Sequence, residues 1–232
     1  MADTSLTYLG GDTESSFEVR VSPPNDGTKP AIGSPMMGPM VEFIQHFWPM
    51  WEGAGTDLID LGIGLSASII GADITWGAAS RGIGLDAAGF TAGTDDVTVP
   101  QIVLSKGYSL ERLFTLDSGT TWIHELIVND PDNDEKVVYH DGVVVEKLAY
   151  DPSDASITSL LAAWGAYDLA IAGMGIEYVR IWNRALEAFE VADLYSNPYL
   201  MFGVSQEILN EIITVIDFMK PMGTEFSITE ES

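Results

Sequence analysis

The sequence contains no cysteine and few basic residues: 10 lysines and arginines stand against 35 aspartates and glutamates, which gives a formal net charge of −25. Without cysteine, the chain has no disulfide scaffold, no zinc ribbon and no cysteine nucleophile. A protein that binds duplex nucleic acid needs a basic surface to neutralise phosphates, so this partner is excluded as well. The three histidines are too scattered in the sequence to indicate a zinc site.

Long hydrophobic runs are also missing. The most apolar stretch, residues 208–219, spans about 12 residues and includes Asn210, Glu211 and Asp217, whereas a membrane-spanning helix needs roughly 20 apolar residues. We therefore expect no membrane span. The N-terminus shows neither a basic region nor an apolar run, so we expect no secretory signal. Hydrophobic residues still make up 46% of the chain, which is enough for a folded core.

Composition divides the chain into three parts. Residues 1–39 are rich in proline and glycine and read as an extended arm. Residues 40–203 contain short strand-like runs separated by turn residues, and residues 204–232 form a tail. The strand-like runs include residues 41–48, 112–116, 121–128, 167–171 and 176–182. The recurring strands predict an all-β fold, an antiparallel β-sandwich with one short helix at residues 187–195. An Asp-Gly pair at Asp141 and Gly142 lies between two valine-rich runs and predicts a β-hairpin.

The arm and the tail carry apolar residues that a single domain does not need. In the arm, Phe17, Val19 and Val21 alternate with charged residues as in a strand, and an isolated strand must pair with something. In the tail, a predicted helix carries an apolar stripe, although part of it is also good strand sequence. The residues of the stripe are Ile208, Leu209, Ile212, Ile213 and Ile216. We expect both segments to make assembly contacts with other copies or other subunits.

Three stretches resemble the laminin-G-like, concanavalin A-like jelly-roll family. They are residues 48–55 (WPMWEGAG), residues 138–143 (VYHDGV), and residues 177–186 (EYVRIWNRAL) with the following LYSNP at 194–198. The resemblance covers roughly residues 40–203 and departs from the family at Glu187, where a helix-capping serine is usual. It implies two antiparallel sheets packed face to face. Such domains occur in secreted lectins, in glycan-processing enzymes, and in head, tail or fibre proteins of tailed viruses.

The sequence offers no catalytic constellation. Retaining glycanases on this fold use closely spaced carboxylates along one strand, but the one Asp-x-Glu pair, Asp12 and Glu14, lies in the arm. The sequence contains no Gly-x-Ser-x-Gly elbow and no phosphate-binding glycine loop before a helix. We therefore predict a protein that is not an enzyme and that requires no cofactor.

The candidate metal site is an acidic loop. Asp130, Asp132 and Asp134 alternate along it, and Asp141 falls where a calcium loop would place its twelfth ligand. Calcium prefers such oxygen ligands. The sixth position lacks the expected glycine and the segment runs into a hairpin, so the alternative is a solvated acidic turn.

The candidate carbohydrate site is aromatic. Trp122 and His124 share one face of a strand, where an indole beside a polar ring could stack on a sugar, and Trp76 and Trp164 are further candidates. The alternative is that these side chains pack in the core of the sandwich.

Together these features favour a non-enzymatic structural protein of a tailed virus, a capsid decoration or a tail or fibre subunit that is assembled in the host and carried on the virion. Its partners would be other virion subunits or further copies of itself. The high acidity fits a saline or marine source. The alternative is a lectin-like, carbohydrate-binding module for host attachment, and a glycan-processing enzyme is the third reading.

Overall fold

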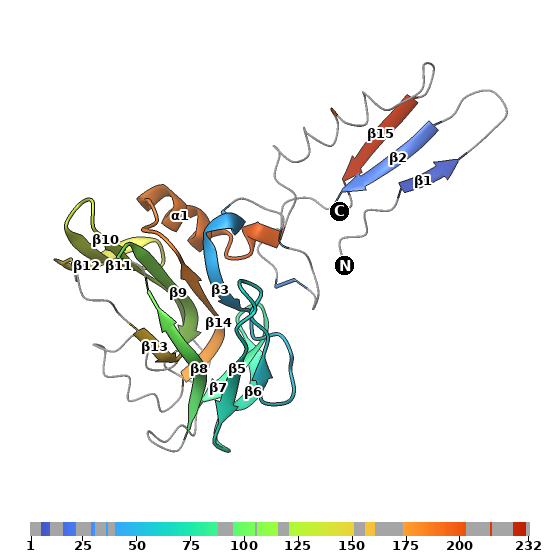
Figure 1. Cartoon of the computed structure of the whole chain (residues 1–232). Helices are drawn as coiled ribbons and strands as arrows, with labels where there is room; N and C mark the ends of the chain where they lie inside the picture. Colours follow the sequence, from blue (N-terminus) through green and yellow to red (C-terminus); the bar gives the residue numbers. More distant parts are fainter. Residues whose placement is uncertain are drawn as a thin grey trace. The chain divides into compact units, whose positions relative to one another are not determined.

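The computed structural model of the chain describes residues 6–9, 16–21, 29–30, 36, 40–87, 95–104, 106–115, 121–150, 156–160, 174–202, 214 and 225–230 (Figure 1). Contacts divide the chain into two compact units. One is Glu42–Ser196, and the other combines Met1–Val41 with Asn197–Ser232. Within the described ranges, no helix is both long and apolar enough to span a membrane.

The larger unit contains an eight-stranded antiparallel sheet. Seven of its strands follow the order β12-β11-β10-β9-β14-β7-β6, and β3 also pairs with β14. The bounds are β3 (Ile44–Trp48), β6 (Thr75–Ala79), β7 (Gly82–Ala87), β9 (Tyr108–Thr115), β10 (Trp122–Asp130), β11 (Glu135–His140), β12 (Val143–Ala149) and β14 (Met174–Trp182).

A smaller four-stranded antiparallel sheet completes the sandwich. Its order is β13 (Ser156–Ser159), β8 (Asp96–Val103), β5 (Ala67–Ile70) and β4 (Asp57–Leu58). The hydrophobic core joins the two sheets, because buried Leu110, Phe114 and Ile181 of the large sheet cluster with Ile69 and Val97 of the small one. The structure therefore confirms the predicted all-β antiparallel sandwich with a jelly-roll-like core.

The predicted hairpin is present. β11 and β12 pair across Asp141 and Gly142, whose φ angles are +51° and +76°. Positive φ at both central residues is the signature of a type I′ turn, which matches the twist of the flanking strands. The preceding hairpin joins β10 to β11 through a four-residue turn at residues 131–134, and Asp134 there has a φ of +54°.

Two predicted elements have different bounds in the structure. The strand expected from Val41 begins at Ile44, because Val41–Phe43 forms a 3-10 turn after Met40, whose φ is +69°. The predicted helix is α1 (Ala188–Ser196), and a second 3-10 turn follows at Leu200–Phe202. The strand expected at residues 167–171 lies outside the described residues.

The second unit contains a three-stranded sheet built from both ends of the chain. β2 (Ser16–Val21) is central, β1 (Leu6–Leu9) pairs with it antiparallel, and β15 (Glu225–Glu230) pairs with it parallel. The strand predicted at Phe17, Val19 and Val21 thus has partners in its own chain. The predicted apolar stripe of the tail lies outside the described residues.

Candidate functional site

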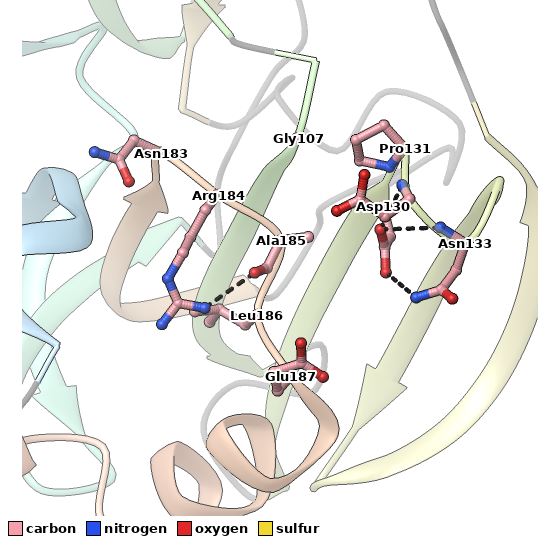
Figure 2. Close-up of a pocket in the computed structure, with 10 residues that line it drawn as sticks. Gly107, Asp130, Pro131, Asn133, Asn183, Arg184, Ala185, Leu186 and Glu187 are labelled. Atoms are coloured by element: carbon pink, nitrogen blue, oxygen red, sulfur yellow. Dashed lines mark hydrogen bonds between the residues drawn. The ribbon is translucent and has the colours of Figure 1, made fainter.

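A pocket of about 510 Å³ opens between the β10–β11 turn and the segment that connects β14 to α1 (Figure 2). Both walls belong to the larger unit. The lining residues are Gly107, Asp130, Pro131, Asp132, Asn133, Asn183, Arg184, Ala185, Leu186 and Glu187. Polar side chains therefore line the walls, and small or apolar residues lie between them.

Asp130 shapes the first wall. Its Oδ1 accepts hydrogen bonds from the backbone N–H groups of Asp132 (2.9 Å) and Asn133 (3.3 Å), and its Oδ2 accepts one from the Asn133 side chain at 2.6 Å. Burial alone would raise the pKa of Asp130, but these hydrogen bonds outweigh it and lower the pKa. Asp130 therefore stays ionised and fixes the turn, as Asp does in an Asx-turn.

Ser109 at the start of β9 holds the second wall. Its Oγ donates to the carbonyl of Arg184 at 3.0 Å and accepts from the N–H of Leu186 at 3.0 Å. Ser109 and Leu186 are both buried. This pair of bonds anchors the backbone of the connecting segment to the sheet, so the wall has a fixed position relative to β9.

Glu190 organises the same wall from the first turn of α1. Its carboxylate accepts hydrogen bonds from both terminal nitrogens of Arg184, at 2.7 and 2.5 Å, and from the N–H of Glu187 at 2.8 Å. The last bond is the reciprocal half of a capping box, so helix capping at this end does not depend on a serine at position 187. Pairing with Glu190 raises the pKa of Arg184.

Gly107 forms the floor. A Cβ atom placed there would lie 3.3 Å from Cδ of Pro131 and 3.7 Å from the backbone N of Ala185, so a side chain would occupy the gap between the two walls. The loop before Gly107 is held in place because the carbonyl of Lys106 accepts a hydrogen bond from the side chain of Asn129 at 2.9 Å.

The pocket is acidic. Asp130, Asp132 and Glu187 contribute three carboxylates, and the one basic side chain that lines the pocket, Arg184, is already paired with Glu190. The carboxylates of Asp132 and Glu187 accept no hydrogen bond from any residue that the structure describes, so they are available to a ligand. Burial raises the pKa of the Tyr139 phenol, and the negative charges of Glu187 and Asp130 add to the rise.

The structure separates the four candidate calcium ligands. Asp130 ends β10, and Asp132 and Asp134 lie in the turn that follows it, but Asp141 lies at the far end of β11, where its Oδ1 accepts the N–H of His124 at 3.0 Å. Across the described part of the chain, no group of three or more acidic or histidine side chains is arranged to hold a metal ion.

The structure does not bring the candidate sugar-stacking residues together in one site. Trp122 and His124 share a face of β10, but His124 is 2% exposed and only Trp122 reaches solvent. Trp76 packs against the core cluster on the opposite face of the sheet, and its Nε1 donates to the carbonyl of Gly55 at 2.9 Å. Trp164 lies outside the described residues.

Sequence reasoning missed a buried polar cluster on the large sheet. Glu111 of β9 is fully buried, and its carboxylate accepts hydrogen bonds from side chains of β10 and β14. The donors are Tyr178 Oη (2.8 Å), His124 Nε2 (3.0 Å), Arg180 NH1 (2.9 Å) and Trp182 Nε1 (2.9 Å). Burial raises the pKa of Glu111, but Arg180, His124 and Tyr178 outweigh it, and the pKa falls to about 2. An ionised Glu111 requires His124 Nε2 to carry the proton.

This cluster lies on the face that the sandwich core does not use. Alternation along β9 places Leu110 and Phe114 in the core and Glu111 on the other face. The ring of Tyr195 from α1 lies 6.0 Å from the ring of His124, so the helix covers the cluster. The sequence signal for it is a pair of charged residues, Glu111 and Arg112, at the centre of a strand that also carries Leu110, Leu113 and Phe114.

No family model and no curated protein matches the sequence. Among solved structures, the chain is similar to the Trypanosoma rangeli sialidase in complex with sialic acid, with a TM-score of 0.47 and 11% identity over 69% of this chain and 34% of that one. It is also similar to the binding domain of botulinum neurotoxin serotype G, with a TM-score of 0.48 and 13% identity over 66% and 50% of the two chains. The chain spans about a third to a half of these proteins, and neither similarity assigns it a family or an activity.

Proposed function

We propose that this chain is a carbohydrate-binding β-sandwich module and that the pocket beside the β10–β11 turn is its binding site. The observation that carries the proposal is the pocket itself. Its walls offer the carboxylates of Asp132 and Glu187 and the side-chain oxygen of Asn133, while Gly107 leaves a gap between them. A sugar ring needs this combination, because its hydroxyls are hydrogen-bonding groups and one of its faces is largely C–H.

The way in which the walls are held supports binding. Asp130 fixes one wall through hydrogen bonds within its own turn, and Ser109 and Glu190 fix the other. A site whose polar groups are already in place loses less conformational entropy when a ligand binds. This compensates for the modest strength of each hydrogen bond that a hydroxyl makes in water.

A binding role is favoured over catalysis by the carboxyl groups. A glycosidase needs a proton donor whose pKa is raised. In the pocket, the hydrogen bonds that hold Asp130 in its turn lower its pKa instead. We therefore propose a module that holds a glycan without cleaving it.

The proposal is tested by screening the full chain on a glycan array and then by calorimetry with the strongest ligand. Asp132→Ala should weaken binding about ten-fold, the value of one good charge-assisted hydrogen bond, without lowering the melting temperature. The matched control is Asp73→Ala, which removes an exposed carboxylate from a turn outside the pocket lining. An array without hits, or affinity that Asp132→Ala leaves unchanged, contradicts the proposal.

A structural role in a virion is the second candidate. It combines the laminin-G-like resemblance with one specific observation, the sheet in which β2 from the arm is flanked by β1 and by β15 from the tail. A small sheet of this kind needs a packing partner to be stable. A capsid or tail neighbour, or a second copy, would supply it. Light scattering on the full chain at low and high salt tests for self-assembly, and a monomer at both contradicts assembly through identical copies.

A further inference from the structure

We infer that the pocket selects uncharged sugar rings over acidic ones, and that Gly107 is the residue that gives the pocket the depth to take a ring. The inference rests on the proposed carbohydrate-binding function. It names the class of ligand and the residue that sets the fit.

The preference for uncharged sugars follows from the hydrogen bonds that the basic side chain of the pocket already makes. Arg184 is the basic group of the lining that could pair with a uronate or sialate carboxylate, but both of its terminal nitrogens bind the Glu190 carboxylate. Its guanidinium carbon also lies 4.1 Å above the ring of Phe43. To meet an anionic sugar, Arg184 would have to leave Glu190, which also caps α1 through the N–H of Glu187. An acidic sugar therefore finds no free cation in the pocket.

The remaining charges act against an anion. Asp130, Asp132 and Glu187 all line the cavity. The hydrogen bonds within the turn hold the pKa of Asp130 below its ordinary value, so this carboxylate stays charged at neutral pH. Three nearby like charges should weaken binding of an acidic sugar about ten-fold at low salt, and less in high salt because the pocket is open to water. Neutral hydroxyls, in contrast, donate to the same carboxylates.

The depth of the pocket depends on the missing side chain at position 107. A Cβ atom there would lie 3.3 Å and 3.5 Å from Cδ and Cγ of Pro131, and 3.7 Å from the backbone of Ala185. Figure 2 shows Gly107, which directly precedes β9, between the turn that carries Pro131 and the segment that carries Ala185. A branched side chain would fill the gap and close the floor. The φ of Gly107 does not lie in the left-handed region, so such a substitution adds no backbone strain.

The test is calorimetry on the full chain with two matched pairs of ligands, lactose with sialyllactose and mannotriose with trimannuronate. The wild type should bind at least one neutral member, and the acidic partner of that sugar about ten-fold more weakly. The double variant Asp132→Asn/Glu187→Gln keeps one acceptor oxygen at each position and removes two charges, so the difference should fall to about three-fold or less. Equal affinity of the wild type for both members of a pair overturns the inference while leaving carbohydrate binding intact. Binding of neither member of either pair overturns both.

Gly107 is tested separately. Gly107→Val should abolish binding of the neutral sugar, and the control Ala78→Val, which places the same side chain at an exposed position of β6, should not. If Gly107→Val fails to fold, Gly107→Ala replaces it and should weaken binding by shifting the Pro131 ring. Unchanged affinity in a folded Gly107 variant overturns the role assigned to this residue.

Discussion

Glu111 and Arg180 form an ion pair inside the large sheet, with NH1 of Arg180 2.9 Å from Oε2 of Glu111 and both side chains fully buried. The pair joins β9 to β14, and Tyr178 and Trp182 donate to the same carboxylate. Arg180 also lies over the ring of Phe47, 4.3 Å from its centroid, which ties β3 to the cluster. One carboxylate thus helps to hold β3, β9 and β14 together, in addition to apolar packing.

Removing that carboxylate should destabilise the fold strongly. Glu111→Gln leaves Arg180 buried without its counter-charge, and breaking a buried pair costs about 3 kcal/mol or more. Urea denaturation measures the change in the free energy of unfolding. The control is Glu187→Gln, whose carboxylate is exposed and should change the free energy by less than about 0.5 kcal/mol. A Glu111→Gln protein as stable as the control contradicts the account of the cluster.

Glu111 also predicts how stability depends on pH. The pKa of its carboxyl group is lowered from 4.5 in the unfolded chain to about 2 in the folded one. A lowered folded-state pKa contributes stability above the unfolded value, and this contribution is lost as pH falls through the folded value. The free energy of unfolding should therefore decline between about pH 5 and pH 2, and by less in Glu111→Gln. Equal slopes for the two proteins across this range would show that Glu111 is not the dominant group.

The buried carboxylate of Asp60 holds the loop after β4. Its carboxylate accepts hydrogen bonds from His46 Nδ1 (2.7 Å) and from the N–H groups of Phe47, Gly62 and Leu65 (2.8 Å each). Asp60→Ala would leave buried donors without partners and should cost about 2–3 kcal/mol in urea denaturation. The exposed Asp57→Ala on the same segment is the matched control. Equal losses for the two variants contradict the structural role of Asp60.

Calcium binding can be tested directly, because two of the four candidate carboxylates already accept hydrogen bonds from the protein. Asp130 already accepts three hydrogen bonds in its turn, and Asp141 binds the backbone of His124. We expect millimolar calcium or EDTA to leave the melting temperature unchanged within about a degree, because a ligand that binds only the folded state would raise it. A rise of several degrees that Asp132→Asn abolishes would establish a calcium site instead.

Local signals in the sequence predicted the elements that depend on neighbouring residues. The Asp141-Gly142 turn, the strand ending at Trp182 and the helix that follows it are coded by contiguous residues. The weaker strands from β4 to β8 escaped prediction because glycines, prolines and exposed positions interrupt their alternation. β15 was missed as well, although Phe226 and Ile228 alternate with polar residues in the sequence.

The candidate site could not be read from the sequence in the same way. The sequence predicts the acidic turn at Asp130 and Asp132 as a set of metal ligands rather than as one wall of a pocket. The opposite wall starts at Asn183, and the floor at Gly107 lies 24 residues before Pro131. Only the register of β9 with β10 and β14 brings these segments together. The tryptophans are candidates by residue type because aromatic rings bind sugars, but residue type alone does not show which face of a sheet a ring occupies.

The central claim, that the pocket beside the β10–β11 turn binds a neutral sugar, is tested most directly by mapping amide chemical shifts during titration with lactose and with mannotriose. At least one sugar should shift the amides of residues 107, 130, 132, 133 and 183–187, while those of β6 and β13 stay in place. Shifts that concentrate outside these segments, or no shift with either sugar, would contradict the account.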